Sequence, residues 1–139
     1  MKEYLILISA VDNRLIITLN DKEVYDSELS HKPLIFEPPL QLPITHLLQP
    51  EGDNLLTFDF YNGGITATDI EHSNPYHFEY RIVERSTDDI GGHRDKDVVP
   101  RVMLKDVSKP CIWLTPKRYS VKKEGEAFVF CEVKPAYQS

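Results

Sequence analysis

Histidine has the widest chemical range of any side chain in this sequence, because its imidazole binds metals and exchanges protons near neutral pH. None of the five histidines shows the His-x-x-x-His spacing of a helical metal site or adjoins a serine or cysteine nucleophile motif. They are His31, His46, His72, His77 and His93. We expect His46 to lie in a turn and His77 on the outer face of a strand. The sequence therefore predicts no enzyme, no cofactor and no metal site.

A second group of chemically active side chains lies between residues 85 and 100, around Gly91 and Gly92. Its acidic and imidazole members are Asp88, Asp89, His93, Asp95 and Asp97. Carboxylates beside glycines are typical of calcium loops, but the EF-hand order is missing and Arg94 and Lys96 lie among the acids. We predict a long, polar, solvated loop at 85–100, whose length favours a role in binding a partner.

Aromatic and amide side chains form a third group, because a flat aromatic ring matches the apolar face of a sugar. Tyr61 and Asn62 end a predicted strand, and His72, Asn74 and Tyr76 belong to the next turn. Together, Tyr61, Asn62, His72, Asn74 and Tyr76 predict a candidate ligand site. Trp113 lies between Ile112 and Leu114, and we expect it in the core.

The elements that must position these groups are predicted to be strands. Period-two alternation places Leu56, Phe58 and Phe60 on one face of a strand over 54–61, and Phe78, Tyr80 and Ile82 on one face of a strand over 76–85. Further strands are predicted over 4–11, 14–19, 23–25, 33–37, 101–104, 112–115, 119–121 and 127–133. Pro38, Pro39 and Pro43 indicate an edge strand or connector, because proline donates no ladder hydrogen bond. Residues 44–49 form at most a short helical turn.

Length and composition define the broad class. A chain of 139 residues, with 41% hydrophobic and 27% charged side chains, is typical of one globular domain spanning residues 1–139. Many short strands with almost no helix predict an all-β β-sandwich or jelly roll. The net charge of -6 argues against nucleic-acid binding, which needs a basic surface, and fits a basic partner.

The cysteines and the apolar runs bear on location. We expect Cys111 and Cys131 to be free and buried, with a disulfide as the alternative that would imply an oxidising compartment. No apolar run approaches the length that spans a bilayer, and residues 1–11 suit a strand better than a signal peptide. These observations predict a cytoplasmic protein without a membrane partner. The sequence leaves the oligomeric state open.

One stretch resembles a known family. The run Leu19-Asn20-Asp21-Lys22-Glu23-Val24 is followed by Ile44-Thr45-His46-Leu47-Leu48-Gln49-Pro50-Glu51-Gly52-Asp53-Asn54 and a strand. This order is similar to that of the galactose-binding-like jelly rolls, over roughly residues 14–62. The sequence departs from the family pattern at two places. Asp21 stands where the family has a turn glycine, and the linker contains the Pro38-Pro39 pair. The resemblance implies a β-sandwich whose relatives mostly bind sugars or proteins without catalysis.

Two functions follow as hypotheses. The first is a non-catalytic module that binds another protein through the 85–100 segment, one version being an acidic inhibitor or immunity-type protein that covers a basic site. The second is a carbohydrate-binding module of galactose-binding-like type that uses the Tyr61 to Tyr76 group. An enzyme on a cupin-like scaffold is disfavoured, because the histidines are not clustered.

Overall fold

Strand β5 (Asn54–Asn62) shows how this sequence forms sheets. Its burial alternates along the strand, with Leu56, Phe58 and Phe60 fully buried and the residues between them facing outward. A strand presents successive side chains to opposite faces, so this sequence pattern buries one face and leaves the other to solvent. The predicted strand and its buried face are confirmed.

The computed structural model describes residues 2–30, 32–63, 74–88, 90–109 and 112–134, with backbone alone at 74–75, 106–109 and 112. The strands are β1 (Lys2–Val11), β2 (Arg14–Leu19), β3 (Lys22–Asp26), β4 (Leu34–Pro43), β5, β6 (Asn74–Thr87), β7 (His93–Lys109), β8 (Ile112–Trp113), β9 (Lys117–Glu124) and β10 (Ala127–Glu132). Within these residues the only helix is the 3-10 turn η1 (Thr45–Leu47), which matches the short turn expected there.

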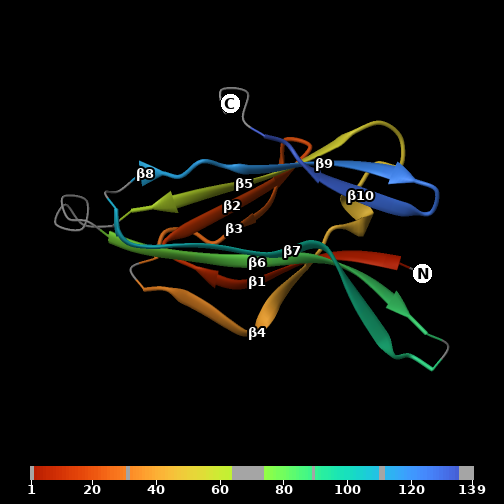
Figure 1. Cartoon of the computed structure of the whole chain (residues 1–139), viewed down its shortest axis with the longest axis horizontal. Coiled ribbons are helices and arrows are strands. Elements are labelled where there is room, and N and C mark those ends of the chain that lie inside the picture. Colours follow the sequence, from red (N-terminus) through yellow and green to blue (C-terminus); the bar gives the residue numbers. More distant parts are fainter. Residues whose placement is uncertain (1, 31, 64–73, 89, 110–111, 135–139) are drawn as a thin grey trace.

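The strands form two antiparallel sheets that pack face to face (Figure 1). Sheet A has the order β4-β1-β6-β7. Sheet B has the order β10-β9-β5-β2-β3, with the short β8 paired to β5. The predicted all-β sandwich is confirmed.

One apolar cluster between the sheets contains buried residues from β1, β2, β5, β6, β7 and β9. At its centre the ring of Phe58 from sheet B stacks on Tyr80 from sheet A, with centroids 4.1 Å apart. Phe60 meets Phe78 edge to face at 5.0 Å. Aromatic pairs of this geometry add to the stabilisation from burial, so they fix how the two sheets face one another.

The motif that carries the family resemblance has a structural explanation. The buried side chain of Asn54 accepts a hydrogen bond from the Gln49 amide at 2.8 Å and donates to the Gln49 and Val121 carbonyls at 2.9 and 3.1 Å. Asn20 donates to the same Asn54 oxygen at 2.8 Å. Buried polar groups need such partners, so this asparagine closes the turn and ties it to β9.

The prolines of β4 fit the edge position predicted for them. Among the described strands, β4 pairs only with β1, from Leu34 to Pro43, and forms one edge of sheet A. An edge strand tolerates the loss of amide donors on its outer side. The strand is longer than the predicted 33–37, because it continues through Pro38 and Pro39 to Pro43.

The predicted long loop at 85–100 is wrong. β6 continues to Thr87 and β7 begins at His93, so the two strands form one hairpin with paired residues from Asn74↔Lys109 to Thr87↔His93. The outer part of this hairpin extends beyond the two layers at the lower right of Figure 1. Because much of this ribbon lies outside the sandwich, it needs no apolar alternation, and the sequence pattern therefore lacks the usual strand signal.

Two further expectations are wrong. Cys131 is free but exposed on β10, whereas we expected it to be buried. Cys111 lies outside the described residues. Trp113 is 53% exposed on β8 instead of packing in the core. In the described part of the chain, no helix has the length and apolar character needed to cross a membrane.

Candidate functional site

The tip of the β6–β7 hairpin is a compact turn closed by Asp88. The Asp88 carboxylate accepts hydrogen bonds from the amides of Ile90 and Gly92 at 3.0 and 2.6 Å, and the Asp88 amide donates to the Gly92 carbonyl at 2.9 Å. Gly91 has a φ of +84°, which favours glycine. These contacts close the turn, and the Asp88 carboxylate is engaged by the turn amides.

Cross-strand ion pairs hold the stem of the hairpin. Arg85 binds Asp95 through two hydrogen bonds of 2.8 and 3.0 Å, and it also donates to Gln41 at 3.2 Å. Arg81 pairs with Asp97 at 3.0 Å. The hydrogen bonds from Arg85 hold the pKa of the Asp95 carboxyl below its usual range. Bidentate arginine–carboxylate pairs have a defined geometry, so the stem has a fixed shape.

These contacts correct the predicted partner-binding residues. Asp95 and Asp97 are neutralised by arginines, and Asp88 binds the turn amides. His93 contacts Thr87 across the strands, with its Nδ1 3.3 Å from the hydroxyl oxygen. Asp89 lies outside the described residues. The described residues of the predicted partner-binding group therefore belong to a hairpin. Their carboxylates bind arginines or turn amides of that same hairpin.

The base of the outer hairpin is anchored in the sandwich by Tyr4. The buried Tyr4 hydroxyl donates to Glu84 of β6 at 2.9 Å and accepts from the Phe128 amide of β10 at 2.8 Å. Lys2 lies 3.6 Å from the same Glu84 carboxylate. Burial raises the pKa of the Tyr4 hydroxyl, which stays protonated and able to donate. One side chain thus connects β6 to strands of both sheets.

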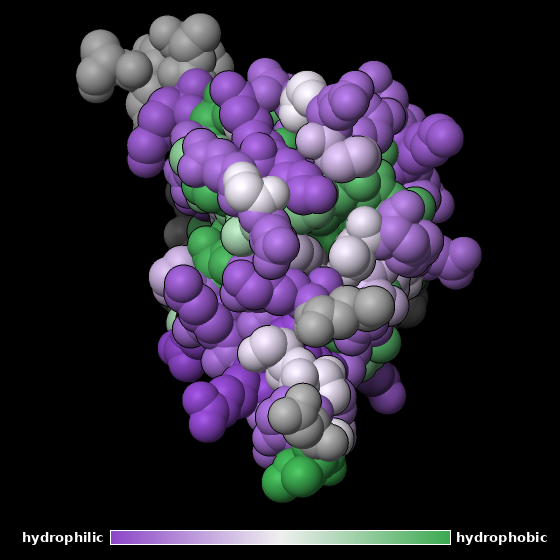
Figure 2. All heavy atoms as spheres, turned by 90° about the vertical axis from the view of Figure 1, so that its right-hand side faces the viewer, coloured by the Kyte–Doolittle hydropathy of each residue, from purple (hydrophilic) through white to green (hydrophobic). Residues whose placement is uncertain are grey.

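Sequence reasoning missed the most exposed apolar side chain of the described residues. Ile90, at the hairpin tip, is 92% exposed, whereas the other large apolar side chains that are exposed range from 37% to 62%. Figure 2 views the molecule from the hairpin end and shows hydrophobic colour at the lower tip, beneath a mostly hydrophilic surface. The sequence did contain a signal for this exposed tip. Ile90 stands beside Gly91 and Gly92, between one segment with arginines and another with aspartates. The hairpin can place one apolar group far from the body of the protein.

The predicted ligand residues are divided between two faces. Tyr61 lies on the outer face of sheet B, and its ring meets Trp113 with centroids 5.0 Å apart. Asn62 is the next residue along β5 and is fully buried. Tyr76 packs against the core beside Phe78, at a centroid distance of 6.1 Å. The predicted grouping of Asn62 and Tyr76 with Tyr61 is therefore wrong.

Two members of that predicted group are less fully described. Asn74 pairs with Lys109 through the backbone at the start of β6, and His72 lies outside the described residues. The structure brings Trp113 to Tyr61 instead, so the exposed aromatic pair consists of one predicted residue and one that was expected in the core.

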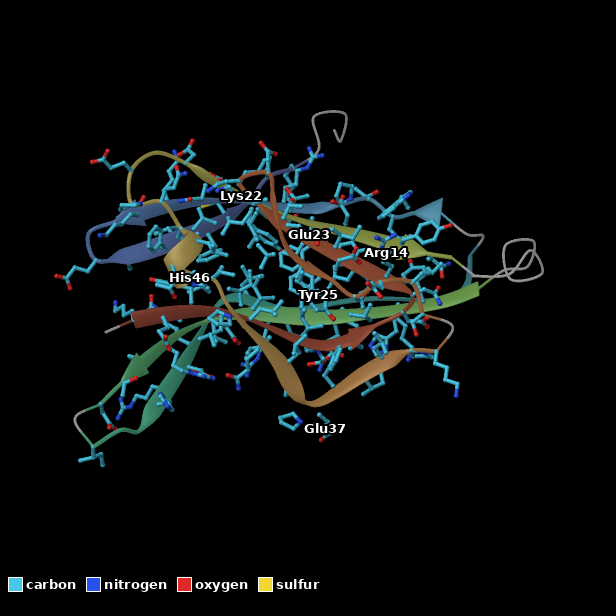
Figure 3. The ribbon with its side chains drawn as sticks, turned by 180° about the vertical axis from the view of Figure 1, so that it is seen from behind. Arg14, Lys22, Glu23, Tyr25, Glu37 and His46 are labelled. Atoms are coloured by element: carbon cyan, nitrogen blue, oxygen red, sulfur yellow. The ribbon has the colours of Figure 1, made fainter. Side chains whose placement is uncertain are left out.

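Neighbouring residues hold the Tyr61 ring in place. A Cβ atom at Gly63 would lie 1.9 Å from the Tyr61 ring, so the ring occupies space that only glycine leaves open. Arg14 pairs with Tyr61 across the strands and binds Asp26 through hydrogen bonds of 3.0 and 2.6 Å. Figure 3 shows Arg14 at the end of the sandwich opposite the hairpin. The aromatic pair and the hairpin tip are thus two separate candidate surfaces.

The structure offers no metal centre within the residues it describes, where no three histidine, cysteine, aspartate or glutamate side chains are placed to hold an ion. Among the described residues, Asp12 carries a buried carboxyl group, and its neighbour Asn13 is buried as well. Burial raises the Asp12 pKa, and the nearby His77 opposes that effect. His77 itself lies on the outward face of β6, 3.5 Å from Glu79, in the position expected for it.

Comparison with known proteins gives no identification. The chain matches no family model, no curated protein and no solved structure. The hairpin and the Tyr61–Trp113 pair are therefore the features of the molecule from which a function can be inferred.

Proposed function

We propose that this chain is a non-catalytic binding module that recognises another protein, and that the β6–β7 hairpin is its main contact element. The observation that carries the proposal is the 92% exposure of Ile90 at the tip of an ion-paired hairpin. An apolar side chain on an already ordered turn loses little conformational freedom on binding, so most of its burial contributes to affinity.

The geometry defines the chemistry of the partner. A partner that receives this tip needs an apolar recess of about one side chain, surrounded by polar groups that face the Arg–Asp pairs of the stem. The net charge of -6 favours a partner with a basic surface, through long-range attraction and faster encounter. An inhibitor or immunity-type protein remains one version of this proposal, with the apolar tip as its anchor in place of a free acidic loop.

The proposed setting is the cytoplasm. The support is the free, exposed thiol of Cys131, because reducing compartments preserve such thiols.

The test is a comparison of captured proteins between matched baits. Wild type, Ile90→Asp and Ile35→Asp proteins are immobilised and exposed to lysate of the source organism, and bound proteins are quantified by mass spectrometry. Ile35 is the control because it is an isoleucine of β4 with 62% exposure. We expect one stoichiometric protein on wild type and Ile35→Asp that is lost from Ile90→Asp. Equal capture by all three baits would remove the hairpin tip from the proposal.

Carbohydrate binding is the second candidate, on a galactose-binding-like scaffold. The observation that favours it is the Tyr61–Trp113 pair on the outer face of sheet B, beside the Arg14–Asp26 ion pair. Exposed rings with charged hydrogen-bonding neighbours suit the apolar and polar faces of a sugar. Asn62 and Tyr76 no longer belong to this hypothesis, because Asn62 is fully buried and Tyr76 packs against the core.

A glycan array tests this second candidate. We expect a modest signal that is lost in Trp113→Ala and reduced in Gly63→Ala, where the new Cβ displaces the Tyr61 ring. Trp113 is the single tryptophan of the chain, so its fluorescence shows whether Gly63→Ala moves the ring. An array without signal at high protein concentration would count against the carbohydrate hypothesis.

A further inference from the structure

A slot opens at one side of the sandwich, between the edge strands β7 and β10. It is an open groove of about 300 Å³, the lower end of the range for small-molecule sites. Its lining residues are Val98, Val99, Pro100, Val102, Tyr119, Phe130 and Glu132. Because β7 ends the order of sheet A and β10 ends that of sheet B, no described strand closes this side.

Valines of β7 make the wall of the slot apolar, at a point where the pairing of the strand is irregular. The β6–β7 register shifts on both sides of Ile82, close to Pro100. The core cluster includes Val99, and both Val98 and Val102 pack against it. Bulges of this kind bend a strand and redirect its side chains, and they are frequent beside binding sites. The wall therefore offers contact to an apolar molecule along several consecutive residues.

Tyr119, one of the lining residues, contacts Tyr80 of the core through its hydroxyl. Tyr119 is 3% exposed and Tyr80 is 1% exposed, and their hydroxyl oxygens are 2.7 Å apart. Burial raises the pKa of both hydroxyls, so both remain protonated at neutral pH. The pair carries two protons, and the bond between the oxygens uses one. Neither hydroxyl has another hydrogen-bond partner among the described residues, so one O–H donor has no protein acceptor.

The charges at the rim are already balanced. Glu132 lies 3.9 Å from Lys117 and 3.4 Å from Lys134. The carboxylate therefore requires no cationic ligand, and the slot favours a neutral one.

We propose that this slot binds a small neutral molecule with an apolar body and one hydrogen-bond acceptor, such as a ketone or an ester. The body lies against the valines of β7 and Phe130. The acceptor accepts a hydrogen bond from the Tyr119 hydroxyl, while the Tyr80 hydroxyl donates to Tyr119. This site goes beyond the proposed protein-binding function, because none of its lining residues belongs to the Asp88–Gly92 turn.

Two probes of nearly equal shape test the proposal. Acetophenone carries a carbonyl, and α-methylstyrene replaces its oxygen with a methylene group. Each is titrated into the ¹⁵N-labelled full chain and followed by NMR. We expect both to shift amides that line the slot, and acetophenone to bind roughly fivefold more tightly, the effect of one net hydrogen bond. The absence of shifts at the slot, or equal affinity for the two probes, would overturn the proposal.

Matched tyrosine variants assign the hydrogen bond. Tyr119→Phe removes the hydroxyl that we propose binds the acceptor, and we expect the preference for acetophenone to disappear. Tyr80→Phe retains that hydroxyl, so the preference remains. Val98→Trp fills the slot from the side, and we expect it to weaken the binding of both probes. A preference that survives Tyr119→Phe would also overturn the proposal. If Tyr119→Phe does not fold, the comparison of the two probes on wild type decides.

Discussion

The two parts of strand β6 are stabilised in different ways. Along Phe78, Tyr80 and Ile82 the strand is buried in the aromatic core, where its side chains are at most 1% exposed. From Glu84 to Thr87 it leads into the hairpin tip, still paired with β1 as far as Ser86. There Arg85 pairs with Asp95, and nearby Arg81 pairs with Asp97. Apolar burial contributes several kcal/mol per large side chain, whereas surface ion pairs contribute about 1 kcal/mol or less.

This difference separates folding from proposed function. The inner part of β6 holds the two sheets together, and a change there affects the whole molecule. The outer part carries Ile90, for which we propose a partner, and we expect a change there to affect the stability of the sandwich less. The hairpin surface can therefore be altered while the core remains folded, which makes the functional proposal testable by mutation.

The largest effect is expected from Phe78→Ala in the inner part. Phe78 is 1% exposed and packs edge to face on Phe60, so its truncation leaves a cavity in the core. We expect the free energy of unfolding, measured by urea denaturation, to fall by about 3–5 kcal/mol. A loss below about 1 kcal/mol would contradict the assignment of this part of β6 to the core.

Tyr4→Phe tests the junction between the two parts. The substitution removes the acceptor of the Phe128 amide and the donor to Glu84, while the ring remains in place. We expect a loss of about 1–3 kcal/mol in the free energy of unfolding, because a backbone amide loses its partner. Faster amide exchange at Glu84 and Phe128 should accompany the loss. Unchanged exchange at both positions would show that Tyr4 does not anchor the hairpin.

Asp95→Asn tests the outer part. The variant keeps the size of the side chain and removes its charge, so the bidentate pair with Arg85 is weakened. We expect the free energy of unfolding to fall by about 1 kcal/mol or less. A loss as large as that of Phe78→Ala would break the distinction between the two parts of the strand.

The same ion pair predicts a response to pH. The pKa of Asp95 is lowered in the folded state, so the pair stabilises the hairpin above the usual carboxyl pKa of about 3.9. This contribution is lost as the pH falls through the lower, folded-state pKa. The NMR signal of the Arg85 side-chain N–H should report this change in wild type and lack it in Asp95→Asn. The same titration in both proteins would mean that another group controls the signal.

Ile90→Asp should have the smallest effect on stability. Ile90 is almost fully exposed and makes no core contact, so we expect a change within about 0.5 kcal/mol in the free energy of unfolding. Urea denaturation of the variant beside wild type measures it. A larger loss would mean that the tip contributes to folding, and the exposure of Ile90 would then be no argument for a partner.

The sequence alone predicts the inner part of β6 well and the outer part poorly. Alternating apolar residues, as at Phe58 and Phe78, identify strands with one buried face. Residues 85–97 carry no such alternation, because cross-strand ion pairs hold this part of the hairpin, whereas Val98 and Val99 reach the core. The complementary order of Arg81 and Arg85 against Asp95 and Asp97, around two glycines, was the signal that could have predicted it.

The candidate ligand site shows a similar limit. Tyr61 and Asn62 are adjacent in a strand, and alternation alone places them on opposite faces. The position of Trp113 could not be predicted from its apolar neighbours, since a strand of two residues gives no pattern that indicates its buried face. Tyr61 and Trp113 come together because β5 pairs with β8. No local pattern in the sequence specifies that these two strands pair.

The central claim is that the hairpin tip contacts a protein partner, and photo-crosslinking in the source cells tests it most directly. The photoreactive amino acid p-benzoylphenylalanine is placed at position 90 in one protein and at position 35 of β4 in another. The account predicts one discrete crosslinked protein from position 90 and none of that mass from position 35. Absence of a crosslink at position 90, or the same products from both positions, would contradict it.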